Sequence, residues 1–127
     1  METHKDLRVW HQSIELVTTI YMMTKTFPKE ELFGLVSQMR RAIVSVPSNI
    51  AEGYARGTDR EKLHFLRISS GSMAEVETQL LLSLNLGYIN QESYDELSET
   101  ITSVWKQLNA LISSIKKKLS PQEQLPF

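Results

Sequence analysis

The sequence predicts an all-α protein, an antiparallel up-down-up-down four-helix bundle, and three observations support this fold class. Apolar residues recur at three- and four-residue steps in four separate segments, which is the spacing of one helix face. No segment alternates apolar and polar residues over several positions, so no sheet is expected. Short connections rich in proline and glycine separate the segments, and short connections make consecutive helices antiparallel neighbours.

The first predicted helix covers residues 7–27 and is apolar over a wide arc. One of its stripes consists of Leu7, Trp10, Ile14, Val17 and Tyr21. The second stripe consists of Val9, Leu16, Ile20, Met23 and Phe27. A helix that packs on one side needs only one such stripe, so part of this helix is expected to be left uncovered. Pro28 ends the helix, because the residue before a proline is displaced from helical geometry.

The second predicted helix begins near Lys29 or Glu30 and has Pro47 inside its apolar pattern. Proline removes a backbone donor and clashes with the carbonyl one turn earlier, which costs about 3 kcal/mol in a regular helix. We therefore expect the second helix to be kinked at Pro47, or broken between residues 43 and 47. Residues 53–58 are expected to connect it to the third helix.

The third and fourth predicted helices have recognisable ends. Thr58 and Glu61 have the spacing of a capping box at the start of the third helix. Gly87 is typical of the position that follows the end of a helix. Asn90 is expected to cap the fourth helix, and the lysines at residues 116–118 suit the negative end of its dipole.

Gly71 interrupts the third predicted helix at the level where Arg41 and Ala42 are expected on the second. Glycine in a helix costs up to about 1 kcal/mol relative to alanine. Two interpretations follow. Either Gly71 allows a close approach of helices two and three, which we favour, or it is merely tolerated.

The chain, at 127 residues, is long enough for one domain. We assign residues 1–120 to the bundle and residues 121–127, which contain two prolines, to a short unstructured tail. Cysteine is absent, which excludes a disulfide framework and a zinc–thiolate site. Neither a signal-peptide pattern nor a run of about 18 apolar residues is present, so we expect a cytoplasmic protein without a membrane partner.

Three motifs resemble those of a known family: residues 6–10 (DLRVW), 46–57 (VPSNIAEGYARG) and 71–80 (GSMAEVETQL). They are similar, in sequence and in order, to the four-helix bundle proteins encoded in intervening sequences of bacterial 23S rRNA genes. The resemblance covers nearly the whole chain and implies ring-shaped homopentamers without an established catalytic activity. A related branch comprises the accessory proteins of diversity-generating retroelements, which are basic and bind nucleic acid and reverse transcriptase.

The wide apolar arc of the first helix independently favours a homo-oligomer. An apolar stripe that the bundle leaves uncovered forms an exposed patch, and such patches usually mark interfaces. The candidate interface residues are Val9, Trp10, Leu16, Ile20, Met23 and Phe27. The alternative is that these side chains fill a thick core. The expected partner is therefore a second copy of the chain, and the resemblance implies a pentamer.

Charge is distributed unevenly along the chain, although the formal net charge is only −1. The candidate contacts to RNA or DNA are Arg40, Arg41, Arg56, Arg60, Lys62 and Arg67. Residues 75–99, in contrast, carry acidic residues and no lysine or arginine. In a ring the basic segment would recur around the axis and gain avidity for phosphates. The alternative, which we favour, is that the charges pair within the protein. Arg41 would then reach Glu75, and Glu52 would lie opposite Arg60.

The sequence predicts no catalytic, cofactor or metal site and no small-molecule substrate. Di-iron bundles need Glu-x-x-His on each of two helices, and only Glu61 and His64 have this spacing. No Gly-rich phosphate loop of the Walker or dinucleotide type is present. Ser69, Ser70 and Ser72 are expected to form a packing surface. We therefore expect a non-catalytic scaffold or interaction protein, with a nucleic-acid-binding accessory protein as the alternative.

Overall fold

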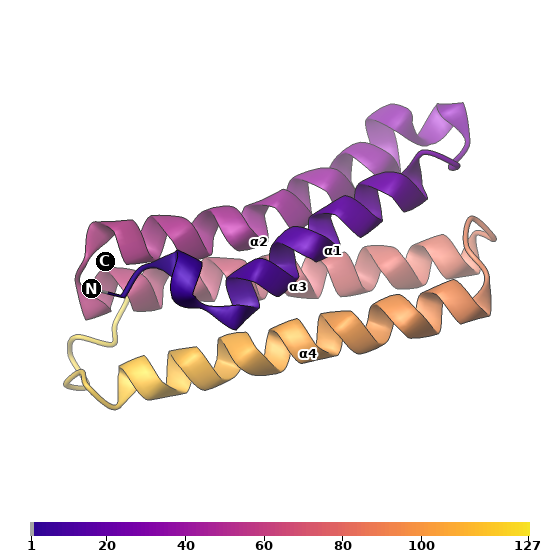
Figure 1. Cartoon of the computed structure of the whole chain (residues 1–127). Coiled ribbons are helices and arrows are strands. Elements are labelled where there is room, and N and C mark those ends of the chain that lie inside the picture. The colour runs from indigo at the N-terminus through magenta and orange to yellow at the C-terminus, as the bar shows by residue number, and fades with distance from the viewer. Residues whose placement is uncertain (1) are drawn as a thin grey trace.

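The structure is a computed structural model that describes residues 2–127. It contains four long helices, α1 (Arg8–Thr24), α2 (Ser37–Arg56), α3 (Asp59–Asn85) and α4 (Gln91–Lys116). Within residues 2–127 there is no β-strand, so the predicted all-α class with four helices is confirmed. In Figure 1, α1 runs from one end of the molecule to the other, α2 returns, and α3 and α4 repeat this alternation.

The core lies between the four helices and receives side chains from each of them. The contact between α2 and α3 is the most extensive, and α1 packs more on α2 than on α4. The largest completely buried side chains are Leu16, Ile20, Met39, Ile43, Val46, Ile50, Leu63, Leu66, Met73, Leu80, Ile101 and Leu108. Each such side chain contributes about 1.5–3 kcal/mol relative to an exposed one. In the part of the chain that the structure describes, none of the helices combines the length and apolar character that a membrane crossing requires.

Helices α2 and α3 approach each other closely at Gly53, not at Gly71. A Cβ atom on Gly53 would lie 3.0 Å from the Cβ of Phe65, so only glycine fits there without a shift of α3. A Cβ atom on Gly71 would meet nothing within 4 Å. The hydroxyls of Ser45 and Ser72 lie 2.9 Å apart, and this register turns Gly71 outward. The favoured interpretation of Gly71 is therefore wrong, and this glycine is tolerated.

Helix α2 continues through Pro47 to Arg56 as one helix, so the predicted break between residues 43 and 47 does not occur. The kink at Pro47 stays a prediction. The interruption lies earlier, between α1 and α2. There a 3-10 turn, η2 (Lys29–Glu31), leads into a π-helical turn, η3 (Leu32–Val36), in which Gly34 leaves helical geometry. Helical structure thus begins where expected, but it is irregular until Ser37.

The predicted start of α3, its end before Gly87 and the start of α4 are confirmed. Two other ends are corrected, because α1 stops at Thr24, before Phe27, and residues 53–56, expected in a connection, belong to α2. Thr58 caps α3, since its Oγ1 accepts a hydrogen bond from the backbone N–H of Glu61 at 3.1 Å. The Glu61 carboxylate accepts from the Thr58 hydroxyl at 2.9 Å, instead of reaching the backbone N–H that the capping box predicted. The side chain of Asn90 accepts a backbone N–H of α4 at 2.8 Å. Gly87 follows α3 with a φ of +77°, a conformation that glycine adopts at no steric cost.

Candidate functional site

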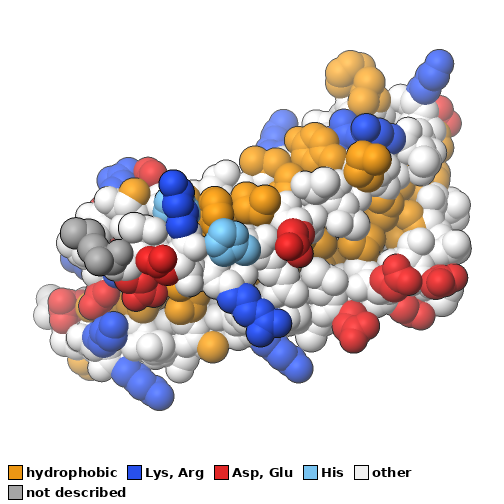
Figure 2. Space-filling model, in the orientation of Figure 1, with side chains coloured by type: hydrophobic (Ala, Val, Ile, Leu, Met, Phe, Trp, Pro, Cys, Tyr) orange, Lys and Arg blue, Asp and Glu red, His pale blue; other side chains and the backbone are white. Residues whose placement is uncertain are grey.

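Two surfaces near opposite ends of the bundle carry the side chains that can contact another molecule. The apolar tip consists of Tyr21, Met22, Leu32, Phe33 and Val44, on α1, η3 and α2. The basic turn consists of Arg56, Arg60, Lys62 and Arg67, around the connection between α2 and α3. Figure 2 shows hydrophobic side chains gathered over the end of the molecule where α1 gives way to α2.

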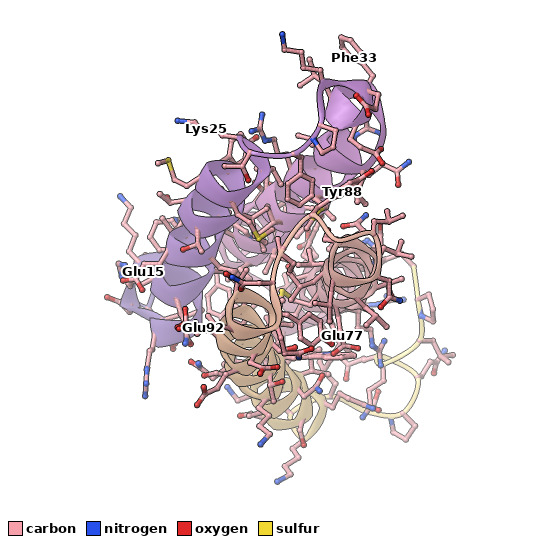
Figure 3. All side chains as sticks on the ribbon, turned by 90° about the vertical axis from the view of Figure 1, so that its right-hand side faces the viewer. Glu15, Lys25, Phe33, Glu77, Tyr88 and Glu92 are labelled. Carbon is pink, nitrogen blue, oxygen red and sulfur yellow. The ribbon has the colours of Figure 1, made fainter. Side chains whose placement is uncertain are left out.

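The irregular turn before α2 creates the apolar tip. Gly34 has φ −110° and ψ −111°, which lies outside helical geometry and forces the chain out of a regular helix. The neighbouring Phe33 consequently points away from the other helices at the outermost point of the molecule (Figure 3). Its ring is 92% exposed, and Leu32 beside it is 48% exposed. Isolated apolar side chains on a surface are common, but two adjacent ones on a protruding turn form a patch.

Glu31 holds this turn from two sides. One carboxylate oxygen accepts the backbone N–H of Leu35 at 3.4 Å, and the other accepts the hydroxyl of Tyr88 at 2.7 Å. The bond to the carboxylate is the main reason that the pKa of Tyr88 is raised above its ordinary value of 10.0. A Cβ atom on Gly34 would lie 3.0 Å from the same carboxylate, so a side chain there would displace it. The connection between α3 and α4 therefore supports the tip.

An open groove of about 500 Å³ runs along the apolar tip, between its aromatic rings and the first turns of α2. Arg40 lines this groove and is fixed in it. Its guanidinium carbon lies 4.6 Å from the centre of the Tyr21 ring, and its Nε donates to Thr24 Oγ1 at 3.0 Å. A second bond runs to the carbonyl of Tyr21 at 3.3 Å, near the negative end of α1. Arg40 thus stabilises the contact between α1 and α2.

Four of the six side chains predicted for the oligomer interface are buried inside the chain itself. These four are Val9, Leu16, Ile20 and Phe27. A side chain sealed in one subunit does not contact another, so their assignment to an interface is corrected, and the thick-core alternative holds for them. Trp10 and Met23 are half-buried and stay candidates. The outward side of α1 instead carries Ile14 and Tyr21, from the other stripe, together with Met22.

The six basic side chains predicted to contact nucleic acid do not form one surface. Arg40 and Arg41 lie beside the apolar tip, near the start of α2. Arg56 is at the other end of the same helix, about 24 Å away at a rise of about 1.5 Å per residue. The remaining three, on the first half of α3, join Arg56 in the basic turn. Any phosphate site is therefore built from one of two separate groups.

Two cations of the basic turn pair with carboxylates. Arg56 lies 3.0 Å from Glu52 and 3.6 Å from Glu61, and Lys62 lies 4.0 Å from Asp59. Pairing within the chain was the favoured expectation, but the partners differ from those predicted. Glu52 pairs with Arg56 instead of Arg60. Among residues 2–127, no salt bridge joins Arg41 to Glu75. Such exposed pairs contribute at most about 1 kcal/mol each.

Residues 120–127 contact Arg60 and Arg67, although both arginines stay exposed, and nothing in the sequence pattern predicted this contact. Arg67 Nη1 donates to the backbone carbonyl of Gln124 at 2.8 Å. The guanidinium carbon of Arg60 lies 4.6 Å from the centre of the Phe127 ring, and the His64 ring centre lies 5.0 Å from it. The boundary between residues 1–120 and 121–127 stays a prediction, but the last residues fold back onto α3 instead of forming an unstructured tail.

A local turn holds the 120–127 segment in shape. The backbone N–H of Ser120 donates to a Glu123 carboxylate oxygen at 3.0 Å, and the N–H of Glu123 donates to Ser120 Oγ at 3.2 Å. The backbone bond from Ser120 is the main cause that lowers the pKa of Glu123 below its ordinary value of 4.5. The Gln124 side chain donates to the carbonyls of Lys116 and Leu119, at 2.9 and 3.2 Å. These bonds tie the segment to the end of α4.

The part of the chain that the structure describes contains no group of three His, Asp or Glu side chains close enough to hold a metal ion. His64 lies between Phe65 and Phe127, with 5.0 Å between ring centres on each side. Glu61 accepts the Thr58 hydroxyl and lies beside Arg56. Both residues of the Glu-x-x-His spacing therefore have structural partners.

The serine cluster of α3 faces its neighbouring helices. Ser69 is buried and donates to the carbonyl of Val46 on α2 at 2.9 Å. Ser70 accepts the indole N–H of Trp105 on α4 at 3.0 Å. With the Ser45–Ser72 pair, these bonds join α3 to both adjacent helices, as expected of a packing surface.

Comparisons with known proteins agree with the fold and the motifs. A profile of the family described as 23S rRNA-intervening sequence protein matches residues 5–110. The chain belongs to this family. Of the solved structures, a crystal structure from Bacteroides thetaiotaomicron, described as a protein with unknown function from the S23 ribosomal protein family, is similar to it. It shares 25% sequence identity, covers 83% of this chain and 95% of its own, and has a TM-score of 0.77. Among curated proteins, none matches. Neither the family description nor that of the solved relative names an enzymatic activity.

Proposed function

We propose that this protein of the 23S rRNA-intervening sequence family is a non-catalytic cytoplasmic scaffold that acts as a homo-oligomer. The observation that supports this most directly is the apolar tip, with Phe33 92% exposed on a protruding turn. Burying Phe33 and Leu32 against a neighbour would contribute about 1.5–3 kcal/mol for each side chain. The family resemblance favours a ring of five subunits.

A ring requires two different surfaces on each subunit, because a head-to-tail contact joins unlike patches. The second surface that we propose is the outer side of α3 near its end, where Leu81, Leu82 and Leu86 are exposed. Glu77 precedes these leucines on α3 and is exposed, whereas Arg41 is exposed beside the apolar tip. Opposite charges on the two surfaces would steer the correct pairing and disfavour contact between like surfaces.

The mass of the protein in solution tests this proposal. We expect light scattering at micromolar concentration to give an oligomer for the unaltered chain and a lower mass for Phe33→Asp and for Leu82→Asp. Each substitution places a charge in an apolar contact, which is unfavourable without a partner. Ala110→Asp is the control, because it adds the same charge at an exposed position of α4. A monomeric unaltered chain would contradict the proposal, and so would equal masses for Phe33→Asp and Ala110→Asp.

A mixture of the two variants distinguishes a head-to-tail contact from a symmetric one. Phe33→Asp retains the leucine surface of α3, and Leu82→Asp retains the apolar tip. In the head-to-tail arrangement the retained surfaces join, and assembly stops at a dimer with one copy of each variant. If the tip instead contacts another tip, the Phe33→Asp subunit joins nothing and no mixed dimer forms. The second result would contradict the ring arrangement while leaving the oligomer in place.

Contact with nucleic acid is a second candidate function. For this function the basic turn is a better candidate site than the group that contains Arg40. Arg60, His64 and Arg67 are three or four residues apart on α3 and so share one face of it. Arg40, in contrast, is held by Tyr21 and Thr24. Titration of a labelled RNA at low and moderate salt tests this function. Binding that weakens steeply with salt and is lost in Arg60→Gln would support it. Absence of binding at low salt would contradict it.

A further inference from the structure

The 120–127 segment lies across the face of α3 that carries Arg60, His64 and Arg67. Between the segment and α3 is a cavity of about 280 Å³, lined on the helix side by these three residues together with Leu63 and Ile68. Phe127 reaches over this face, with the Arg60 guanidinium 4.6 Å and the His64 ring 5.0 Å from its ring centre. Arg67 uses one N–H group to bind the carbonyl of Gln124 at 2.8 Å. An aromatic ring and an oxygen acceptor thus occupy the face together.

The cover is shallow. Phe127 is 65% exposed and Leu125 is 60% exposed, although both lie against the helix. The buried core cluster extends only from Leu7 to Ile115, so no core side chain belongs to the segment. Lifting the segment therefore exposes α3 without opening the core. Displacement breaks the charge-assisted hydrogen bond from Arg67, the stacking of Phe127 on Arg60 and the bonds of the Gln124 side chain to the end of α4. A competing ligand can replace the first two interactions.

The segment also lies outside the part of the chain that the family profile matches, residues 5–110. The helix face lies within the matched residues, whereas its cover lies outside them. A feature that only adds stability to the bundle would be expected to pack against the core. This one instead contacts two cations and a histidine on the surface.

We infer that the Arg60–His64–Arg67 face is a stacking site for single-stranded nucleic acid, and that the 120–127 segment closes it in the isolated chain. The inference rests on the second candidate function above and adds its site and its regulation. A flexible single strand is held by bases stacked on aromatic or guanidinium planes and by cations along the backbone. The position of Phe127 between Arg60 and His64 is where a base would stack, and the Gln124 carbonyl takes the place of a phosphate oxygen on Arg67.

The 120–127 segment and a nucleic acid would compete for the same groups on Arg60 and Arg67. The Phe127 ring occupies one face of the Arg60 guanidinium, and a base cannot stack on that face while the ring is there. Arg67 is exposed and can bind a phosphate more strongly than a carbonyl, because a hydrogen bond to a charged acceptor is stronger than one to a neutral acceptor. Arg56 and Lys62 are already paired with carboxylates, so they add little to binding in the closed state. The intact chain is therefore expected to bind weakly.

Fluorescence polarisation with a labelled oligouridine of about 16 nucleotides tests this inference. The proteins are the full chain, a chain that ends at Ser120, and the full chain with Phe127→Ala. We expect the shortened chain to bind at least about tenfold more tightly than the full chain at about 50 mM salt, with Phe127→Ala between them. Arg60→Gln in the shortened chain is expected to remove the gain. Lys106→Gln, which removes one exposed charge on α4, is the matched control and is expected to retain it.

A free peptide with the sequence of residues 119–127 provides an independent measurement. It is expected to displace the RNA from the shortened chain, whereas the same peptide with Phe127→Ala is expected to displace it poorly. Equal affinity of the full and shortened chains would overturn the closure and leave the nucleic-acid function standing. Absence of binding by both chains would overturn that function and the closure together. A gain that survives Arg60→Gln would show that the site lies elsewhere and overturn the assignment. Circular dichroism of every variant confirms that the bundle is folded.

Discussion

The two ends of the bundle differ in whether other side chains of the same chain cover their aromatic rings. At the basic turn each ring lies beside a cation, with Phe65 5.4 Å from Arg56 and Phe127 4.6 Å from Arg60. At the apolar tip, Tyr21 also lies beside a cation, Arg40, but Phe33 has no such neighbour among residues 2–127 and is almost fully exposed. The comparison teaches that the rings at the basic turn are covered by cations of the same chain, whereas Phe33 at the tip is left without a cover from its own chain.

The largest expected effect compares two phenylalanines near the tip. Phe27 is buried, with its ring centre 5.1 Å from that of Tyr88, whereas Phe33 is exposed. Phe27→Ala should lower the free energy of unfolding by about 3–5 kcal/mol, because it leaves a cavity. Phe33→Ala should change it by less than about 0.5 kcal/mol. Denaturant titration at low protein concentration, where assembly contributes least, measures both. A loss for Phe33→Ala as large as that for Phe27→Ala would show that the ring is covered within one subunit.

A smaller effect is expected at the two helical glycines that face opposite ways. Gly53→Val should lower the free energy of unfolding by about 1–3 kcal/mol, because the added Cβ would meet Phe65 and the backbone of Lys62. Gly71→Ala should raise it by up to about 1 kcal/mol, because alanine is the better helix former and the site is open. Thermal unfolding of both variants checks the signs. Destabilisation by Gly71→Ala would contradict the outward position of this glycine.

The sequence predicted the four helices and the caps of α3 and α4 because these depend on local features. These features depend on residues within one or two helical turns, so they can be recognised from the sequence alone. They are the helical spacing, the Thr58 and Asn90 caps, and Gly87. The register between α2 and α3 is a tertiary property, so the close approach was expected at Gly71 but occurs at Gly53, which had been assigned to the connection. Pro47 inside α2 was expected to permit a break, but packing on α3 maintains the helix across it.

The candidate surfaces were harder to predict, for a physical reason. Both stripes of α1 are apolar, and periodicity alone does not say which of them faces the core. Phe33 belonged to no predicted stripe, and its only local indication was the adjacent Gly34. The distribution of charge along the sequence identified the basic segment. It could not reveal that Arg60 contacts Phe127, which is 67 positions later in the chain. Phe127 was instead expected in an unstructured tail, because no local pattern ties it to α3.

The smallest expected effects are changes in local stability with pH, which occur at high pH near the tip and at low pH at the other end. Near the tip, the raised pKa of Tyr88 means that its neutral form is favoured in the folded state. Its stabilising contribution is therefore complete below pH 10 and is lost as the pH rises through the raised pKa. At the other end, the lowered pKa of Glu123 means that its charged form is favoured. That contribution is complete above pH 4.5 and is lost as the pH falls through the lowered pKa.

The 120–127 segment should therefore loosen in acid and the turn before α2 in alkali. Amide exchange at Ser120 and Glu123, measured by NMR, should accelerate on acidification beyond its intrinsic pH dependence. The ultraviolet absorbance of tyrosinate should show a late component from Tyr54, whose pKa is raised mainly by burial, and from Tyr88, whose pKa is raised mainly by its bond to Glu31. This late component should become smaller in Tyr88→Phe. If its size is unchanged in Tyr88→Phe, the hydrogen bond to Glu31 does not anchor the tip. Because the two titrations lie at opposite ends of the pH range, each end of the bundle can be loosened while the other remains closed.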